Sequence, residues 1–199
     1  MENDKDNITI GRPKVGGAIY WAPLGSTLPT DATTSLSDEF VNLGYVTEDG
    51  VNIPTTESIN EVKAWGPETV MIAQDDFSVT VGFNLLETIR PDVQRFVRGE
   101  SNVAGESDGS LKSALTGEQL PRGILVVETI QNNGTTPREH RIVFGDCQVV
   151  DRSGDENYNN SDPVTYPISV RAFKFDSQAI SGKKVYRDDF WAEEPPVSA

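Results

Sequence analysis

The side chains that most often carry out catalysis are scarce in this chain of 199 residues, which has one histidine, His140, and one cysteine, Cys147. Both lie in an apolar, β-rich stretch, so we expect His140 to be an ordinary strand residue rather than a general base. Cys147 is expected to be a small buried hydrophobic side chain that shares its face with Val143 and Val149. A zinc site would need carboxylates for its remaining ligands, and none stands at ligand spacing. We predict no catalytic residue, no metal site and no cofactor.

One serine lies in a motif that hydrolases use. Residues 105–109 read GESDG, which matches the Gly-x-Ser-x-Gly nucleophile elbow with Ser107 as the nucleophile. That elbow requires an apolar strand before the serine and a helix after it, whereas the flanking residues here are polar and interrupted by glycine. We therefore predict that the match is accidental and that the chain is not an enzyme.

An acidic stretch further along carries oxygen atoms that calcium could use. The candidate donors are Asp151, Asp155, Asn157 and Asp162. The spacing of an EF-hand loop fails, because Glu156 stands where that loop requires glycine. A solvated loop is the prediction.

The three tryptophans are the remaining candidates for binding, because aromatic rings can stack on sugars. Trp21, Trp65 and Trp191 are widely separated in the sequence. Isolated aromatic residues in a β protein usually anchor a core or an interface, and we expect the same here.

The net charge of the chain limits the kinds of molecule that it is expected to bind. The chain carries 31 acidic and 17 basic residues, a formal net charge of -14, and has no run of basic residues. Tight binding to nucleic acid needs lysine and arginine to displace condensed counterions, so we exclude an ordinary nucleic-acid-binding protein. The N-terminus has no apolar signal segment and the longest aliphatic run is residues 124–127, so we expect neither classical export nor membrane anchoring.

The elements that must position these side chains are mostly strands. Residues 76–85 alternate strictly between apolar and polar side chains, which predicts a strand with one buried face. That face is formed by Phe77, Val79, Val81, Phe83 and Leu85. Residues 123–131 and 139–151 flank an Asn-Gly pair and predict a hairpin with a long loop. Further strands are predicted at residues 16–22, 40–48, 58–65, 69–74, 164–175 and 183–187.

One segment has helical spacing instead. After Thr88 come Pro91, then Val93, Phe96 and Val97, with Gly99 placed to end the helix. Helix and strand signals do not alternate elsewhere. We therefore predict a mainly β fold, an antiparallel β-sandwich or barrel with one short flanking α-helix.

The length suits a single domain covering residues 1–199. Two long loops are predicted, at residues 47–57 and 99–123. Residues 1–10 and 188–199 contain little that could join a core, and we expect them to be terminal arms. Long loops in compact domains are usually functional or mobile.

Several segments together suggest a family. They are residues 15–30 (VGGAIYWAPLGSTLPT), 42–50 (NLGYVTEDG), 59–65, 83–88 (FNLLET) and 167–173. In these segments, which span nearly the whole chain, the sequence resembles the major tail proteins that form the tail tube of long, non-contractile phage tails. They are patterns of a fold and its loops and contain no catalytic signature.

The resemblance implies a structural virion protein whose subunits join edge to edge into hexameric rings, and rings that stack into the conduit for DNA ejection. The partners it implies are other copies of the chain, a tape-measure protein and a tail terminator. DNA would pass through without tight binding. The protein would be found in the virion tail after assembly in the cytoplasm of the host bacterium.

The resemblance also implies sites. A negative lumen wall would keep DNA from adhering, and we predict Asp76 and Glu128, each on a predicted strand, as lumen-facing carboxylates. One loop would grip the adjacent ring. Its predicted residues are Thr47, Glu48, Asp49, Gly50, Val51, Asn52, Ile53 and Pro54.

Two other functions remain open. A carbohydrate-binding or host-adhesion β-sandwich of a tail tip would need an exposed aromatic platform. A related tube from a secretion or contractile injection system would share the fold and differ in its cargo.

Overall fold

The computed structural model describes residues 8–14, 16–105, 110–132, 137–152 and 156–193. Nearly half of them belong to one 10-stranded antiparallel sheet, and two short strand pairs stand apart from it. The strands of the large sheet are β1 (Ile10–Pro13), β2 (Ile19–Pro23), β3 (Val41–Asn42), β4 (Val46–Asn52), β5 (Thr55–Lys63), β6 (Thr69–Leu85), β9 (Arg122–Asn132), β10 (Pro137–Asp151), β11 (Tyr166–Ala172) and β14 (Asp188–Glu193). The short pairs are β7 (Val103–Gly105) with β8 (Leu111–Ser113), and β12 (Phe175–Asp176) with β13 (Lys184–Val185).

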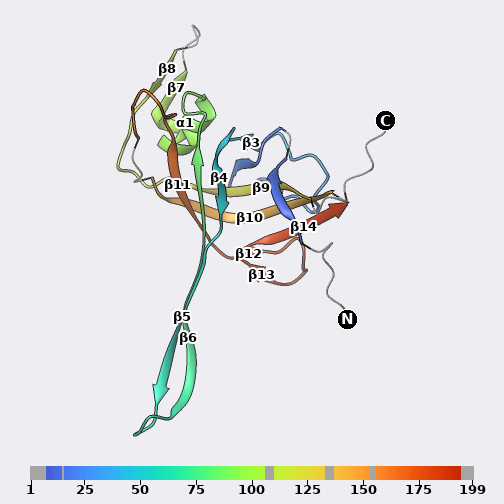
Figure 1. Ribbon diagram of the computed structural model, residues 1–199, viewed down its shortest axis with the longest axis vertical. Helices are drawn as coiled ribbons and strands as arrows, with labels where there is room; N and C mark the ends of the chain where they lie inside the picture. Colours follow the sequence, from blue (N-terminus) through green and yellow to red (C-terminus); the bar gives the residue numbers. More distant parts are fainter. Residues whose placement is uncertain (1–7, 15, 106–109, 133–136, 153–155, 194–199) are drawn as a thin grey trace.

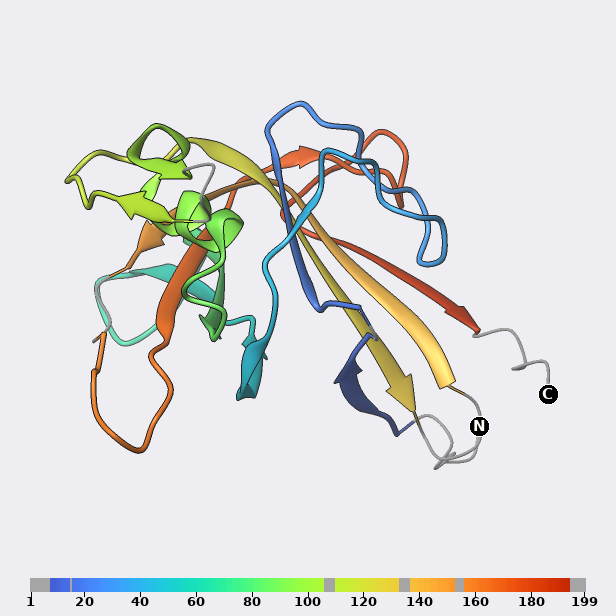
Figure 2. The same cartoon turned by 90° about the horizontal axis from the view of Figure 1, so that it is seen from above.

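The large sheet folds over on itself at β10. Its order is β3-β2-β9-β10-β11-β6-β4, with β1 beside β9, β14 beside β10 and β5 beside β6. The first half of β10 pairs with β14 and the second half with β11. A register shift between Phe144 and Cys147 separates the two halves, and such bulges bend a strand. In Figure 2 the long yellow β9–β10 pair crosses the molecule at an angle to the orange β11. The result is the predicted mainly β, sandwich-like fold, and within the described residues the sheet stays open rather than closing into a barrel.

The main core lies between the two halves of this sheet, under one helix. Val79, Val81, Phe83 and Leu85 of β6 are buried, which confirms the predicted alternation, and Phe77 is half-buried against Tyr186 with a ring-centroid distance of 5.2 Å. Helix α1 (Pro91–Arg98) is also confirmed, with proline in its first turn and Gly99, at φ 98°, as its C-cap.

The outer face of β2 and β9 is covered by an irregular segment. Ala22, Ile124, Val126 and Val143 form a second apolar cluster, and Leu28, Leu36 and Phe40 from residues 24–40 pack onto it. Residues 124–127 are each at most 1% exposed, because β9 has a core on both of its faces. We call residues 24–40 the covering segment.

Cys147 is a buried core residue, as predicted, and its thiol donates to the Gly123 carbonyl oxygen at 3.3 Å. The prediction that Val143 shares its face is wrong. The bulge shifts the alternation by one residue, so Cys147 and Val149 join the main core while Val143 joins the outer cluster.

This environment predicts the reactivity of the thiol. Burial raises the pKa of Cys147, so almost no thiolate forms at neutral pH, and no reagent can reach it while the core is closed. We expect no modification by a maleimide in the native state and complete modification in denaturant, measured by mass spectrometry. Fast labelling of the native protein would show that this part of the core opens.

Several predicted boundaries are wrong. The strand predicted at residues 40–48 is two strands, β3 and the start of β4, and the loop predicted at residues 99–123 contains β7 and β8. Residues 47–57 are not a loop, because strands β4 and β5 occupy nearly all of them. Residues 69–74 and 76–85 form one 17-residue strand, β6. The described part of the predicted C-terminal arm is strand β14, which completes the free edge of β10. The N-terminal arm falls mostly outside the described residues, and β1 begins at Ile10.

Beyond the body of the molecule, β5 and the first half of β6 form a long two-stranded projection (Figure 1). We call residues 57–76 the projecting hairpin. The described part of the chain contains no helix that is long and apolar enough to cross a membrane.

Candidate assembly surfaces

The projecting hairpin carries a concentration of apolar side chains that do not contact the body of the molecule. Its residues are all exposed except Ala73, which is half-buried. The exposed large apolar residues on it are Ile59, Val62, Trp65, Val70, Met71 and Ile72, with exposed fractions from 43% at Val62 to 107% at Trp65. An isolated two-stranded hairpin is marginally stable in water, and contiguous exposed apolar residues usually mark an interaction surface.

The register of the hairpin places apolar residues on both of its faces. Val62 pairs with Met71, and Glu61 pairs with Ile72 one residue further along. Since successive side chains of a strand point to opposite faces, these two pairs face in opposite directions. Neither face has its own core, so both need cover from another molecule.

The margins of the large sheet are a second candidate surface. The order ends at β3 on one side and at β4 on the other, and within the described residues no strand pairs with the outer edge of either. Thr47, Glu48, Asp49, Gly50, Val51 and Asn52, predicted as part of a gripping loop, lie on the edge strand β4, and Ile53 and Pro54 connect it to β5. Unpaired edges are templates for pairing with another chain.

The two predicted lumen carboxylates have different environments. Asp76 is exposed at the base of the projecting hairpin, opposite Ser58. Glu128 is only 5% exposed, and it accepts a hydrogen bond of 2.7 Å from Nε of Arg141. The prediction of Glu128 as an exposed wall charge does not hold for the subunit, because its carboxylate is covered and neutralised there. A lumen position for Asp76 stays a prediction.

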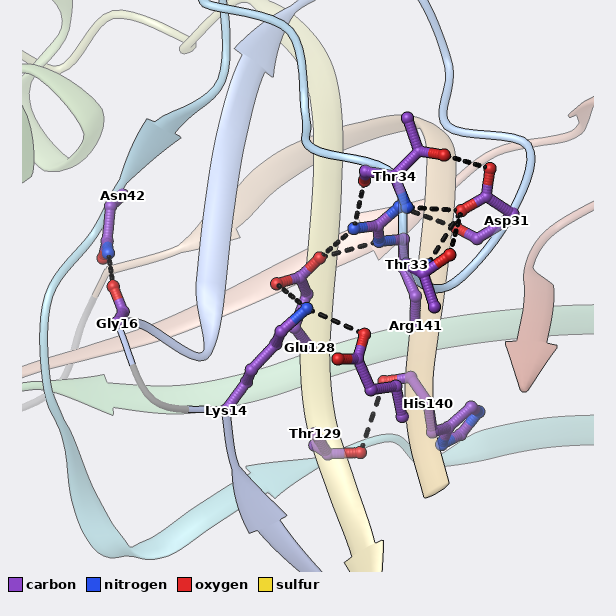
Figure 3. A network of polar contacts seen from close by, with 11 residues as sticks. Lys14, Gly16, Asp31, Thr33, Thr34, Asn42, Glu128, Thr129, His140 and Arg141 are labelled. Atoms are coloured by element: carbon purple, nitrogen blue, oxygen red, sulfur yellow. Dashed lines mark hydrogen bonds and ion pairs between the residues drawn. The ribbon is translucent and has the colours of Figure 1, made fainter. Parts of the chain in front are cut away.

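Glu128 belongs instead to a buried network that fastens the covering segment to the sheet (Figure 3). Arg141 is 2% exposed, and its guanidinium donates to the carbonyl oxygens of Asp31 at 2.6 Å and Thr34 at 2.8 Å. Lys14 completes the network with Nζ at 3.8 Å from Glu128 and 2.9 Å from Glu139. The network is structural, because its charges pair with one another.

The turn that receives Arg141 is held by its own carboxylate. Asp31 accepts hydrogen bonds from the Thr34 hydroxyl at 2.7 Å and from the backbone N–H groups of Thr34 at 2.6 Å and Thr33 at 2.8 Å. These bonds favour the ionised form and lower the pKa of Asp31 to about 2. The fixed turn holds the two carbonyl groups where the guanidinium can reach them.

His140 is a strand residue of β10, as predicted, and it helps to hold β14. Its Nε2 lies 2.8 Å from Oδ1 of Asp189, its Nδ1 lies 2.8 Å from Nε2 of Gln131, and its ring stacks on Trp191 at 4.5 Å. Burial raises the pKa of Asp189, but hydrogen bonds from His140 and Arg187 outweigh burial and lower it. This contact was not predicted from the sequence, because residues 188–199 were expected to form a terminal arm.

The remaining candidates do not come together as a site. Trp21 packs on Phe96 at 4.9 Å beside the main core, Trp65 lies on the projecting hairpin and Trp191 lies on β14, so the three rings do not form one platform. Ser107 and Asp155 lie outside the described residues. Within the described residues, no three His, Cys, Asp or Glu side chains gather closely enough to hold a metal ion.

An open β-sandwich with unpaired edges and a projecting apolar hairpin defines a structural subunit suited to assembly with other chains. A family model described as phage tail tube protein matches residues 1–180, and the chain belongs to this family. It is therefore a structural protein of the phage tail, located in the virion, from a family that self-assembles into a tube. The comparison with curated proteins finds no match.

Proposed function

We propose that this chain forms hexameric rings that stack into the tail tube, and that DNA passes through the tube during ejection. The observation that carries the proposal is the projecting hairpin, whose exposed apolar residues on both faces need cover from a neighbouring subunit. The unpaired edges of β3 and β4 support the ring itself, because edge-to-edge pairing between copies would satisfy them. In this role Thr47 to Asn52 contribute an edge strand rather than a loop, and Ile53 and Pro54 connect it to β5.

The chemistry of the subunit supports a non-catalytic role. The buried Glu128 pairs with Arg141, and His140 contacts Asp189. The buried Asp188 accepts hydrogen bonds from Ser177 and from the Gln178 N–H, and Cys147 is enclosed in the core. The tape-measure protein and the tail terminator are the proposed partners that set the length and end of the tube. Assembly takes place in the cytoplasm of the host bacterium.

Electron microscopy of the purified protein over a range of concentrations tests the proposal. We expect six-fold rings and tubes. A stable monomer at every concentration, together with virion tails that lack the protein, would overturn it.

A lumen position for Asp76 leads to a separate prediction. The chain has a net charge of -14, and with a Debye length of about 8 Å at physiological salt a lumen carboxylate repels phosphate only within the nearest molecular layer. We expect Asp76→Lys particles to eject DNA more slowly, because each ring would then place lysines where phosphate passes. Ejection rate in vitro is the measurement.

Asp176→Lys is the matched control for that experiment. Asp176 has an 82% exposed side chain and lies in the separate β12–β13 pair, so its reversal makes the same change in net charge. An Asp76→Lys ejection rate equal to those of the wild-type protein and of Asp176→Lys would show that Asp76 does not line the lumen.

A further inference from the structure

An open pocket of about 430 Å³ lies where β2 and β3 meet α1 and residues 120–122. Its apolar walls are Trp21, Pro23, Val41, Leu43, Phe96 and Leu120. Its rim is charged, with Asp92, Arg95 and Glu100 on one side and Arg122 on the other. A volume in this range and an apolar lining with a few polar groups suit a single large side chain or a small ligand.

One side chain of the chain itself has the matching properties. Trp65 is 107% exposed, the most exposed large apolar residue of the described chain. It lies in the turn of the projecting hairpin, which is closed by a hydrogen bond of 2.9 Å from the Ala64 N–H to the Glu68 carbonyl oxygen. Gly66, at φ 150°, and Pro67 follow it. A tryptophan held out on a tight turn is typical of an interface anchor, because little conformational entropy is lost when it binds.

The turn and the pocket lie at opposite ends of the molecule. In Figure 1 the projecting hairpin extends to one end of the longest axis, while α1 and β3, which line the pocket, lie near the other end. Trp65 therefore cannot reach the pocket of its own subunit. When a protrusion at one end of a subunit fits a hollow at the opposite end of the next copy, the contact is head-to-tail. Such a contact repeats from copy to copy and does not form a closed dimer.

An exposed lysine lies beside the turn, and an exposed carboxylate lies on the pocket rim. Lys63 precedes the turn and is exposed. On the rim, Arg95 lies 3.3 Å from both Asp92 and Glu100, and Asp92 also pairs with Arg90 at 3.6 Å. The Glu100 side chain is 79% exposed and can accept another cation. A second copy of the chain thus offers both a ring to fill the pocket and a lysine for Glu100.

We propose that Trp65 of one subunit occupies this pocket in the next subunit along the tube, with Lys63 placed against Glu100. The inference rests on the proposed stacking of copies and names the contact that joins them. It also accounts for an apolar pocket and an apolar protrusion that are both uncovered in the single subunit.

Cross-linking tests the contact directly while keeping Trp65. Ala64→Cys in one preparation and Val41→Cys in another place thiols beside the ring and in the pocket wall, and both positions are exposed. The native Cys147 is buried and does not compete. After co-assembly and addition of a short bifunctional thiol reagent, we expect a cross-linked dimer. Ala64→Cys with Ile180→Cys, an exposed position that is not part of the pocket lining, is the control pair and should give none.

The outcomes separate this inference from the proposed function. Tubes that form without the Ala64–Val41 cross-link overturn the inference and leave the proposed function standing. A wild-type chain that forms no tubes under any condition overturns the proposed function.

The protein concentration at which tubes begin to form is a second measurement, for use if a cysteine variant does not assemble. We expect Trp65→Ala to raise the concentration needed for tube formation at least about tenfold, as is usual when a central tryptophan is truncated, with an unchanged melting temperature. Glu100→Lys should also raise the threshold, and adding Lys63→Glu should restore it. Wild-type thresholds for both single variants would contradict the proposal.

Discussion

Replacing residues 59–75 with Asn-Gly is expected to abolish tube formation and leave a folded subunit. Ser58 and Asp76 are directly opposite each other, so a two-residue Asn-Gly turn can join them. The deleted residues are exposed, apart from the half-buried Ala73, and the buried part of β6 begins only after Asp76. The subunit therefore keeps its core and loses the surface that we propose is covered by its neighbour.

Two measurements establish this result together. Thermal unfolding should show a melting temperature close to that of the wild-type monomer, and electron microscopy should show no tubes. A full-length variant with Ile59, Val62, Val70 and Ile72 all changed to Thr keeps the hairpin backbone, and it should fail in the same way. Leu24→Thr with Ile180→Thr, two apolar positions that are 50% and 52% exposed outside the hairpin, should assemble normally. Normal tubes from the shortened chain would rule out the projecting hairpin as an assembly surface.

Arg141→Met is expected to lower the free energy of unfolding by about 3–5 kcal/mol, the usual cost of removing one partner of a buried ion pair. The change leaves the Glu128 carboxylate buried with only Lys14, 3.8 Å away, as a cation. It also leaves the carbonyl oxygens of Asp31 and Thr34 without the donor that holds the covering segment. A loss of this size is a large share of the total stability of a typical domain.

The double variant Arg141→Met with Glu128→Leu shows how much of the lost stability comes from the unpaired carboxylate and how much from the lost hydrogen bonds. Removing both charges abolishes the unpaired buried carboxylate, so we expect most of the lost stability to return. Recovery should be incomplete, because the two carbonyl oxygens still lack a donor. Urea unfolding at neutral pH, in the chain with the shortened hairpin so that polymers do not interfere, is the measurement. A loss below about 1 kcal/mol for Arg141→Met would show that this pair is not important for stability.

Local patterns predicted the parts of the fold that have one buried face. The alternation at residues 76–85 reflects a strand with a core on one side, and the spacing of Val93, Phe96 and Val97 reflects a helix packed on a sheet. The hairpin of β9 and β10 followed from two apolar stretches around an Asn-Gly pair. In each case the pattern is visible in the sequence, because a helix or strand with one buried face has apolar side chains at its own structural period.

The same reasoning failed where stability depends on distant partners. Residues 47–57 are rich in polar and turn-forming residues, yet they form β4 and β5, because β6 pairs with the two ends of β4 and with β5 from Thr55 onward. Asp188–Glu193 is likewise polar at its start and becomes a strand because β10 has a free edge there. Strand formation by such segments is decided by hydrogen bonding to a neighbour.

By itself the sequence determined the mainly β class, the single helix, the lack of an evident catalytic group and the resemblance to tail tube proteins. Only the tertiary structure decided that Glu128 faces Arg141 under a covering segment and that Cys147 changes face at a bulge. It alone showed that the apolar residues of the projecting hairpin are exposed and that an apolar pocket lies near the other end of the molecule. The physical reason is that periodicity records whether a side chain is buried, while register, bulges and long-range packing determine which partner buries it.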